Sequence, residues 1–289
     1  MDRGRPTTTC DPSRRRERRR AGPNGTQDRR RALDRQREPL PTRVDATSPL
    51  PAAYHRVLST GLQEIGVELS SAQRSAIDGH VRLLLAWNRS INLTAIRDPE
   101  AAAIGHVIDS LTVLPVMRER GLRSFVDLGS GGGFPGLPVA AALPADGALL
   151  VDSIAKKVRF VDAAAAAVGM AGTIATFTGR AEHLAGDPGH RERWPAVLAR
   201  AVAALPELVE LSFPLLVPGG VLIAWKRGDV SAELTATTRA TGALGGGTVQ
   251  TADVSVTGLH GHRLVVITKT GPTPDDFPRD PAVRRRTPW

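Results

Sequence analysis

Residues 124–141 read SFVDLGSGGGFPGLPVAA, and the other segments are best interpreted from there. An apolar run that ends at Leu128 is typical of a short buried strand. Four of the next five residues are glycine, and apolar residues then follow at helical spacing, with Pro135 suited to a first helical position. Glycine accepts positive φ and lets a ligand approach the backbone, while a helix start offers unpaired N–H groups. This order predicts a nucleotide-like ligand at the turn.

The glycines fit two registers. The pattern G-x-G-x-x-G, from Gly131 to Gly136, matches the fingerprint of dinucleotide-binding proteins. The pattern D-x-G-x-G-x-G, from Asp127 to Gly133, fits better and resembles the first motif of S-adenosylmethionine (SAM) methyltransferases, where the acid lies near the methionine part of the cofactor. The next strand ends in Asp152, nineteen residues after Gly133. A carboxylate at that distance can accept hydrogen bonds from ribose hydroxyls in either family.

The net charge is concentrated in the first part of the chain. The 289 residues carry +9, but residues 1–44 hold 14 arginines and 6 acids, which leaves 24 basic and 23 acidic residues in the remainder. A nucleic-acid site on the folded part must therefore be a local patch. The single cysteine, Cys10, and the scattered histidines predict no disulfide framework and no metal site. Because no apolar run approaches about 18 residues and no secretory pattern appears, we expect a cytoplasmic protein without a membrane span.

Composition divides the chain into four segments. Residues 1–50 are rich in Arg, Pro and Thr, so we expect a disordered extension, which is either an RNA-binding arm or an extension without a role. In residues 51–120, apolar side chains recur at helical intervals and predict three helices. The second is capped by Ser70 or Ser71, and the third starts at Asp98-Pro99.

The third and fourth segments are residues 121–270 and 271–289. The third alternates strands with helices, which predicts a mostly parallel sheet covered on both faces. A short turn joins the last two strands, so they should form an antiparallel hairpin. The fold class is therefore α/β and Rossmann-like, with a seven-stranded sheet preceded by a small helical segment. Prolines and three consecutive arginines predict a loose tail in the fourth segment. The expected strands are 124–128, 148–152, 173–177, 196–199, 220–225, 248–256 and 263–268, and the expected helices are 135–142, 154–168, 205–216 and 229–240.

Two missing motifs narrow the methyl acceptor. The fourth strand is followed by no N/D-P-P-Y/F motif of the kind used to methylate exocyclic amines, since the chain there reads Leu198-Ala199-Arg200-Ala201. The folded part also lacks the cysteine that methylation of a pyrimidine C5 requires. These absences favour an acceptor that is already nucleophilic, such as guanine N7, which has a lone pair and no proton. Positioning should supply most of the rate, so we expect no catalytic acid or base.

Further motifs point to one family. They are Trp87-Asn88-x-x-Ile91-Asn92-Leu93-Thr94, His106-Val107-Ile108-Asp109-Ser110-Leu111, the glycine segment VDLGSGGGFPGLP, Val151-Asp152-Ser153, Lys156-Lys157-Val158-Arg159-Phe160, Gly179-Arg180-Ala181-Glu182, Ala199-Arg200-Ala201 and Trp225-Lys226-Arg227-Gly228. From about Leu84 to Lys269 the chain resembles the bacterial ribosomal RNA small subunit methyltransferase G family, also called glucose-inhibited division protein B. The last motif departs from the usual Leu-Lys-Gly by one extra residue.

The resemblance implies transfer of a methyl group from SAM to guanine N7 in the decoding-region loop of 16S rRNA, within or derived from the 30S subunit. It also implies the residues that line the cofactor. The first loop would contact the methionine end, a strand-end acid would hold the ribose, and two residues after the third strand would flank the adenine. These residues are Gly129, Gly131, Phe134, Asp152, Ala181, Glu182 and Arg200.

On the substrate side, the resemblance implies that Arg200 borders both the cofactor and the base. Arg180 and Lys226 are candidates for RNA phosphates, which cations often bind, although each could equally be a surface cation. His106 and Asp109 fit better as buried polar residues that tie the helical segment to the sheet. Two other hypotheses remain. One is a SAM methyltransferase of a small molecule, which the near-neutral folded part supports. The other is a non-catalytic or NAD-binding module that uses the alternative glycine register.

Overall fold

The computed structural model describes Met1 and residues 40–289, so most of the expected N-terminal extension lies outside the described residues. Residues 40–50, which composition assigns to that extension, are packed onto the helices instead. The Trp87 indole donates to the carbonyl of Pro41 (2.6 Å), and Arg82 donates to the carbonyls of Thr47 and Ser48 (2.6 and 3.0 Å). The prediction was wrong here because apolar residues and carbonyl groups of this stretch find partners on a helix some 40 residues further along the chain.

The helical segment contains the three expected helices, and the third is interrupted. It comprises η1 (Val44–Ala46), α2 (Ala52–Glu64) and α3 (Ser71–Trp87), followed by α4 (Pro99–Ala102), η2 (Ala103–Ile108), α5 (Asp109–Leu111) and α6 (Leu114–Glu119). Ser70 caps α3 through a reciprocal capping box with Gln73. The interruption has two causes. A π-helical turn, η2, inserts extra backbone per turn, and Pro115 cannot supply the N–H that would continue the helix into α6.

The sheet has seven strands in the order β3-β2-β1-β4-β5-β7-β6. Their bounds are β1 (Ser124–Leu128), β2 (Gly147–Asp152), β3 (Ile174–Thr178), β4 (Trp194–Arg200), β5 (Leu216–Arg227), β6 (Gly247–Asp253) and β7 (His262–Lys269). The first five are parallel, and β7 runs antiparallel to both β5 and β6. The predicted fold class, including the antiparallel pair at the end of the chain, is confirmed.

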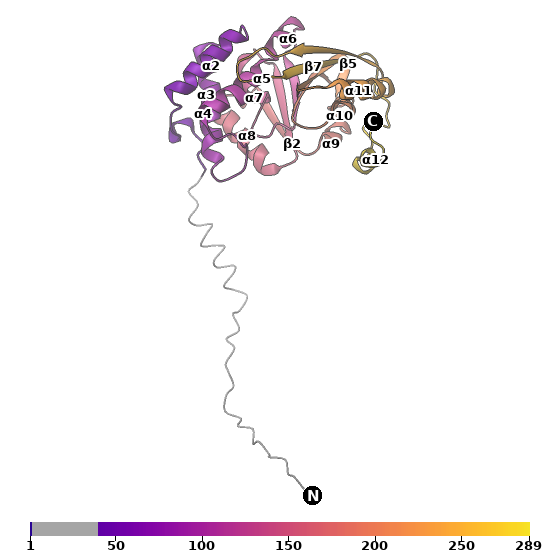
Figure 1. Cartoon of the computed structure of the whole chain (residues 1–289), viewed down its shortest axis with the longest axis horizontal. Coiled ribbons are helices and arrows are strands. Elements are labelled where there is room, and N and C mark those ends of the chain that lie inside the picture. Colours follow the sequence, from indigo (N-terminus) through magenta and orange to yellow (C-terminus); the bar gives the residue numbers. More distant parts are fainter. Residues whose placement is uncertain (2–39) are drawn as a thin grey trace. The chain divides into compact units, whose positions relative to one another are not determined.

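Helices cover both faces of this sheet (Figure 1). One apolar cluster joins the helical segment, α7 (Gly136–Ala142) and α8 (Ala155–Ala167) to side chains such as Phe125 and Leu150. A second cluster joins α9 (Ala181–Ala185), α10 (Leu205–Ser212) and α11 (Ser231–Ala243) to side chains such as Val126 and Leu149. Neighbouring residues of one strand thus enter different clusters, as the alternation of side chains along a strand requires.

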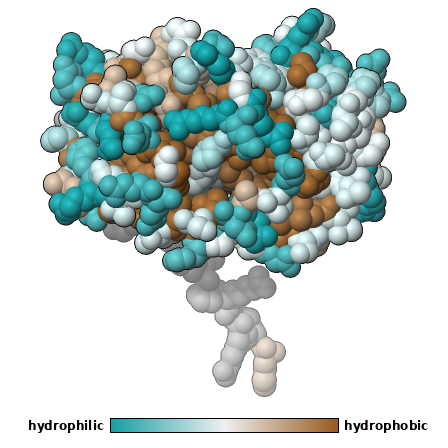
Figure 2. All heavy atoms as spheres, turned by 90° about the horizontal axis from the view of Figure 1, so that it is seen from above, coloured by the Kyte–Doolittle hydropathy of each residue, from teal (hydrophilic) through white to brown (hydrophobic). Residues whose placement is uncertain are grey.

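One helical stretch of the described chain, Pro99–Glu119, is long and apolar enough to cross a membrane, although the sequence has no uninterrupted apolar run of about 18 residues. However, 61% of its apolar window is buried inside the protein, as in a core helix. Viewed from above, apolar residues gather over the middle of the molecule, and hydrophilic residues surround and cross them (Figure 2). A mixed surface of this kind is ordinary for globular proteins.

A buried carboxylate connects β1 to the helix after the glycine turn. Asp127 is fully buried, and its Oδ2 accepts a hydrogen bond from the backbone N–H of Gly136 (2.8 Å), the first residue of α7. Pro135 precedes the helix as its N-cap, one position earlier than predicted. Oδ1 of Asp127 is buried without a partner among the described residues. Burial raises the pKa of Asp127 to about 7, because the charged form loses its hydration.

This raised pKa predicts a pH-dependent effect of Asp127→Asn. The folded-state pKa lies above the unfolded-state value near 4, so the stabilising contribution of Asp127 is complete below pH 4 and is lost as the pH rises through 7. The variant has no such titration. Its stability relative to wild type, from urea unfolding without cofactor, should therefore increase by about 1–3 kcal/mol between pH 5 and pH 8. Parallel pH profiles would contradict this. The exposed Asp276→Asn serves as the control.

The end of the chain is packed rather than loose, contrary to the expectation for residues 271–289. It contains a short helix, α12 (Pro281–Arg286), which lies beside α9 and α10 (Figure 1). Glu210 of α10 is 0% exposed and accepts two hydrogen bonds from the Arg279 guanidinium (2.6 and 2.9 Å) and one from the Trp289 indole (2.7 Å). Arg284 forms an ion pair with Glu182 of α9. Composition predicted a loose tail because these carboxylate partners lie far away in the sequence.

We expect Arg279→Ala to lower the free energy of unfolding by about 2–4 kcal/mol, because it leaves the Glu210 carboxylate buried without its main partner. Chemical denaturation near neutral pH measures the change. Arg285→Ala removes an exposed arginine of the same segment and should alter stability by less than about 0.5 kcal/mol. Equal effects of the two substitutions would show that the contact with Glu210 does not stabilise the fold.

Candidate functional site

The glycine turn after β1 adopts a backbone that side chains disfavour. Gly129, Gly131 and Gly133 have φ of 72°, 56° and 84°. A Cβ at Gly129 would lie 2.7 Å from a methyl group of Val202, whereas a Cβ at Gly131 would meet nothing closer than a backbone oxygen at 3.8 Å. The N–H groups of Gly129 and Ser130 both donate to the carbonyl of Val151 on β2 (2.8 and 2.9 Å). The turn is thus held to the neighbouring strand, with open space beside Gly131.

Asp152, at the end of β2, braces the same turn. Its Oδ2 accepts a hydrogen bond from the N–H of Gly131 (3.0 Å), and its Oδ1 accepts one from the N–H of Ile154 (2.8 Å). Lys157 lies 3.7 Å from the carboxylate, and Asp152 is only 6% exposed. Each carboxylate oxygen has a second lone pair. The carboxylate can therefore position the turn and still accept a hydrogen bond from a ligand hydroxyl.

Phe134 follows the glycines and lies in an aromatic stack. Its ring centroid is 4.4 Å from that of His80 and 4.6 Å from that of His106, and both pairs are stacked. Nε2 of His80 donates to the carbonyl of Gly132 (2.7 Å). Burial lowers the pKa of His80 to about 4, and burial followed by the charge of Arg200 lowers the pKa of His106 to about 3. Both imidazoles are therefore neutral near pH 7, and neither is suited to accept a proton there.

Asp109 of α5 contacts residues from three separate strands. Its Oδ2 accepts from Arg200 at the end of β4 (2.8 Å), and its Oδ1 accepts from Nδ1 of His262 at the start of β7 (3.0 Å). Its backbone carbonyl accepts from the indole of Trp225 on β5 (2.8 Å). Arg200 also donates to the carbonyl of Gly105 (3.2 Å). Sequence analysis missed His262 and Trp225 as members of this cluster, because no local pattern indicates contacts over 116 or 153 residues.

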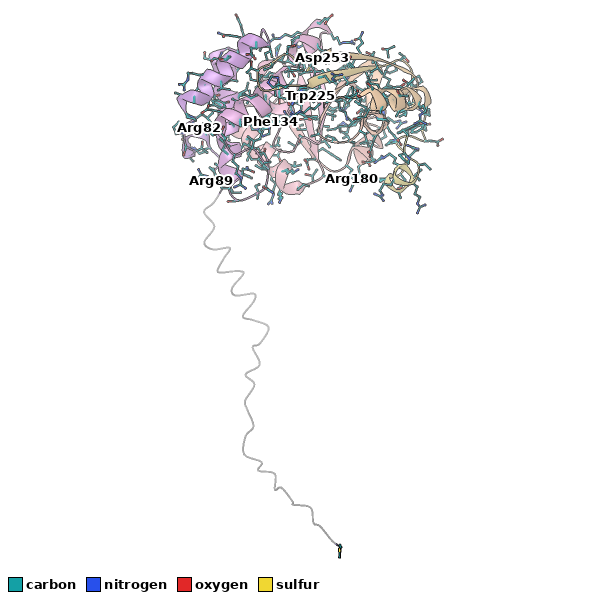
Figure 3. The ribbon with its side chains drawn as sticks, viewed as in Figure 1. Arg82, Arg89, Phe134, Arg180, Trp225 and Asp253 are labelled. Atoms are coloured by element: carbon teal, nitrogen blue, oxygen red, sulfur yellow. The ribbon has the colours of Figure 1, made fainter. Side chains whose placement is uncertain are left out.

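The structure brings together the predicted residues of the first, second and fourth strand ends. The Arg200 guanidinium carbon lies 5.8 Å from the ring centroid of Phe134, which in turn adjoins the turn braced by Asp152. Figure 3 shows Phe134 and Trp225 in the central part of the molecule. The end of β3 lies next to the end of β2, since the N–H of Gly179 donates to the carbonyl of Asp152 (3.1 Å).

Four other predicted residues have different surroundings. The carboxylate of Glu182 is paired with Arg284. The ammonium of Lys226 donates to Glu233 (2.7 Å) and to a backbone carbonyl (3.0 Å), so its charge is already offset. Arg180 is exposed at the N-cap position of α9, and the half-buried Ala181 follows it.

Within the part of the chain that the structure describes, no group of three or more His, Cys, Asp or Glu side chains could hold a metal ion.

Comparison with known proteins agrees with this arrangement. The chain is 36% identical over 228 residues to ribosomal RNA small subunit methyltransferase G of Halalkalibacterium halodurans, covering 78% of this chain and 95% of that protein. It is 40% identical over 235 residues to the protein of the same name from Deinococcus deserti, covering 80% and 95%. A solved O-methyltransferase from Bacillus cereus, in complex with SAH, shares the fold at a TM-score of 0.50 and 10% identity, covering 72% of this chain and 95% of that one.

The family model described as rRNA small subunit methyltransferase G matches residues 73–260. This range contains most of α3, the glycine turn, Asp152, Arg200, and Asp109 with its partner Trp225. With these motifs and the relatives above, the chain belongs to the rRNA small subunit methyltransferase G family.

Proposed function

We propose that this protein transfers a methyl group from SAM to guanine N7 in the decoding-region loop of 16S rRNA, in the cytoplasm and on the 30S subunit or rRNA derived from it. The names of the family and of its relatives support rRNA methylation. The observation that carries the proposal is the open backbone at Gly131, which Asp152 braces, in the turn after β1, whose neighbouring strand β4 ends at Arg200.

The residues at the turn suit SAM, whose sulfonium supplies an electrophilic methyl group when bound. Gly129, Gly131 and Phe134 would line its methionine end. A Cβ at Gly131 would meet no protein atom closer than 3.8 Å, so the backbone there is open to a ligand. The remaining lone pairs of Asp152 would accept hydrogen bonds from the ribose hydroxyls. The N–H of Gly179 donates a hydrogen bond to the carbonyl of Asp152, so the backbone that follows it lies next to the proposed ribose site. The backbone around Ala181 would therefore flank the adenine.

Glu182 has a more limited part in this proposal than the resemblance implies. Its carboxylate is already engaged by Arg284. One carboxylate oxygen is taken up by the ion pair, which holds the start of α9 in place, so the other oxygen, the backbone and the aliphatic carbons remain to contact an adenine.

On the substrate side, Arg200 is the main candidate. One of its terminal nitrogens is committed to Asp109 and Gly105, and the other donors of the guanidinium have no partner among the described side chains. They suit an acceptor such as guanine O6 or a phosphate oxygen. Arg180 is exposed and suits a phosphate, whereas Lys226 is committed to Glu233. Guanine N7 carries no proton to be removed, and the lowered pKa values of His80 and His106 make both imidazoles poor proton acceptors near pH 7. The residues of the site would therefore act by orienting the substrate rather than as general bases.

Gly131→Ala should weaken SAM binding at least about tenfold, which corresponds to about 1.4 kcal/mol. The added methyl group meets no protein atom within 3.8 Å, so it would occupy the space that we assign to the cofactor. Isothermal titration calorimetry measures the affinity. Gly121→Ala is a matched control, because Gly121 also has φ of 64° and nothing within 4 Å but lies in the turn before β1. Unchanged SAM affinity in Gly131→Ala would place the cofactor elsewhere.

Arg200→Ala should reduce methyl transfer to 30S subunits about 100-fold, whereas SAM affinity should fall only a few-fold because the cofactor keeps its other contacts. This loss corresponds to about 2.7 kcal/mol, within the range for a charged group that is lost from a desolvated contact. The measurement is single-turnover transfer from labelled SAM to 30S subunits that lack the modification. Arg239→Ala, an exposed arginine on α11, is the control. A wild-type rate in Arg200→Ala would remove this residue from the site.

A further inference from the structure

The segment after β7 is held on the body of the protein by two ion pairs with little exposure. Arg284 pairs with Glu182, and the two side chains are 9% and 13% exposed. Arg279 pairs with the fully buried Glu210. Burying charged groups is costly unless they are paired and hydrogen-bonded. The carboxylates of Glu182 on α9 and Glu210 on α10 therefore hold α12 in position.

This arrangement presents arginines that have no acidic partner in the part of the chain that the structure describes. Arg285 and Arg286 are exposed in the last turn of α12, next to the anchored Arg284. Arg180 is exposed two residues before Glu182, so the ion pair brings it close to α12. Within residues 40–289 none of the three donates to a carboxylate. The acidic residues near α12 contact other groups. Glu182 pairs with Arg284 and Glu210 with Arg279, Glu207 lies 3.6 Å from Arg284, and Asp280 caps α12.

Arg180 lies on the side of the molecule that carries the candidate site, and the ion pair of Glu182 with Arg284 places α12 beside it. Arg180 follows β3, whose end is hydrogen-bonded to Asp152, and Asp152 braces the glycine turn. Figure 1 shows α9 and α12 side by side, and Figure 3 shows Arg180 at the same end of the molecule as α12. A polymer whose target nucleotide entered the site would extend past this surface.

The charge balance means that RNA binding by the folded part needs a local cluster of this kind. Outside residues 1–44 the chain has only one more basic than acidic residue, so long-range attraction to a polyanion is weak. Phosphate contacts by arginine position a protein on RNA without reading its sequence. A lipid surface fits this cluster less well, because α12 has six residues and Val283 is its single exposed large apolar side chain.

We propose that Arg180, Arg285 and Arg286 form a docking surface for rRNA phosphates that flank the target nucleotide. The pairs Glu182–Arg284 and Glu210–Arg279 hold this surface in place. The inference rests on the proposed function, because that function supplies the rRNA partner. It adds the place where the RNA backbone outside the methylated base is bound.

The test uses the full chain with Arg285→Ala and Arg286→Ala combined. Both side chains are exposed and unpaired, so thermal unfolding should be unchanged. With saturating SAM, the KM for 30S subunits should rise about tenfold, while kcat and SAM affinity stay the same. Each lost phosphate contact should also reduce the slope of log affinity against log salt concentration by roughly 0.7–0.9. Adding Arg180→Ala should increase both effects.

The matched control combines Arg118→Ala and Arg239→Ala, two exposed arginines on α6 and α11 that remove the same net charge. It should leave KM and the salt slope near wild type. An equal change in the control, or no change in the Arg285/Arg286 variant, would overturn the docking surface. Wild-type binding to 30S subunits with loss of binding to phosphatidylserine vesicles in that variant would also overturn it. Failure of the proposed function is separate, since wild-type protein would then not methylate 30S subunits.

Discussion

The carboxylate of Asp109 is the point at which the helical segment is joined to the sheet. It accepts hydrogen bonds from Arg200 and His262, while the adjoining backbone carbonyl accepts from Trp225. A carboxylate this buried would cost several kcal/mol without such partners. The contacts therefore depend on one another, and together they determine the direction of the Arg200 guanidinium. Because Arg200 also lies near Phe134, the positions of the glycine turn and of the β4 end are coupled through this one group.

Burial near the glycine turn favours uncharged side chains. It lowers the pKa values of His80 and His106 and raises that of Asp127. The charged groups that persist are those with several partners, such as Asp152 with two backbone N–H groups. A site of this composition has rigid hydrogen-bonding groups and few groups that exchange protons near neutrality. It suits a reaction whose rate comes from the alignment of two reactants.

The sequence predicted the seven strands, the mostly parallel sheet and the antiparallel pair at its end. Short apolar runs and glycine-rich turns are local features, so a sequence pattern can reveal them. It missed α9, whose five residues are too few to show a helical period. It also missed the packing of Pro41 and Arg279, since each depends on a partner in a distant segment. The candidate site divides in the same way. Gly131 and Asp152 could be identified from their spacing, whereas the partners of Asp109 could not.

The π-helical turn η2 sets the register of everything that follows it in this helix. Its wider ring accommodates one more residue than an α-helical turn would over the same stretch. Loss of one residue from Ala103–Ile108 would rotate the following side chains by about 100° about the helix axis. Asp109 would then face away from Arg200, although composition and hydropathy would hardly change. We therefore expect related chains to preserve the length of this short stretch more strictly than the identity of most of its side chains.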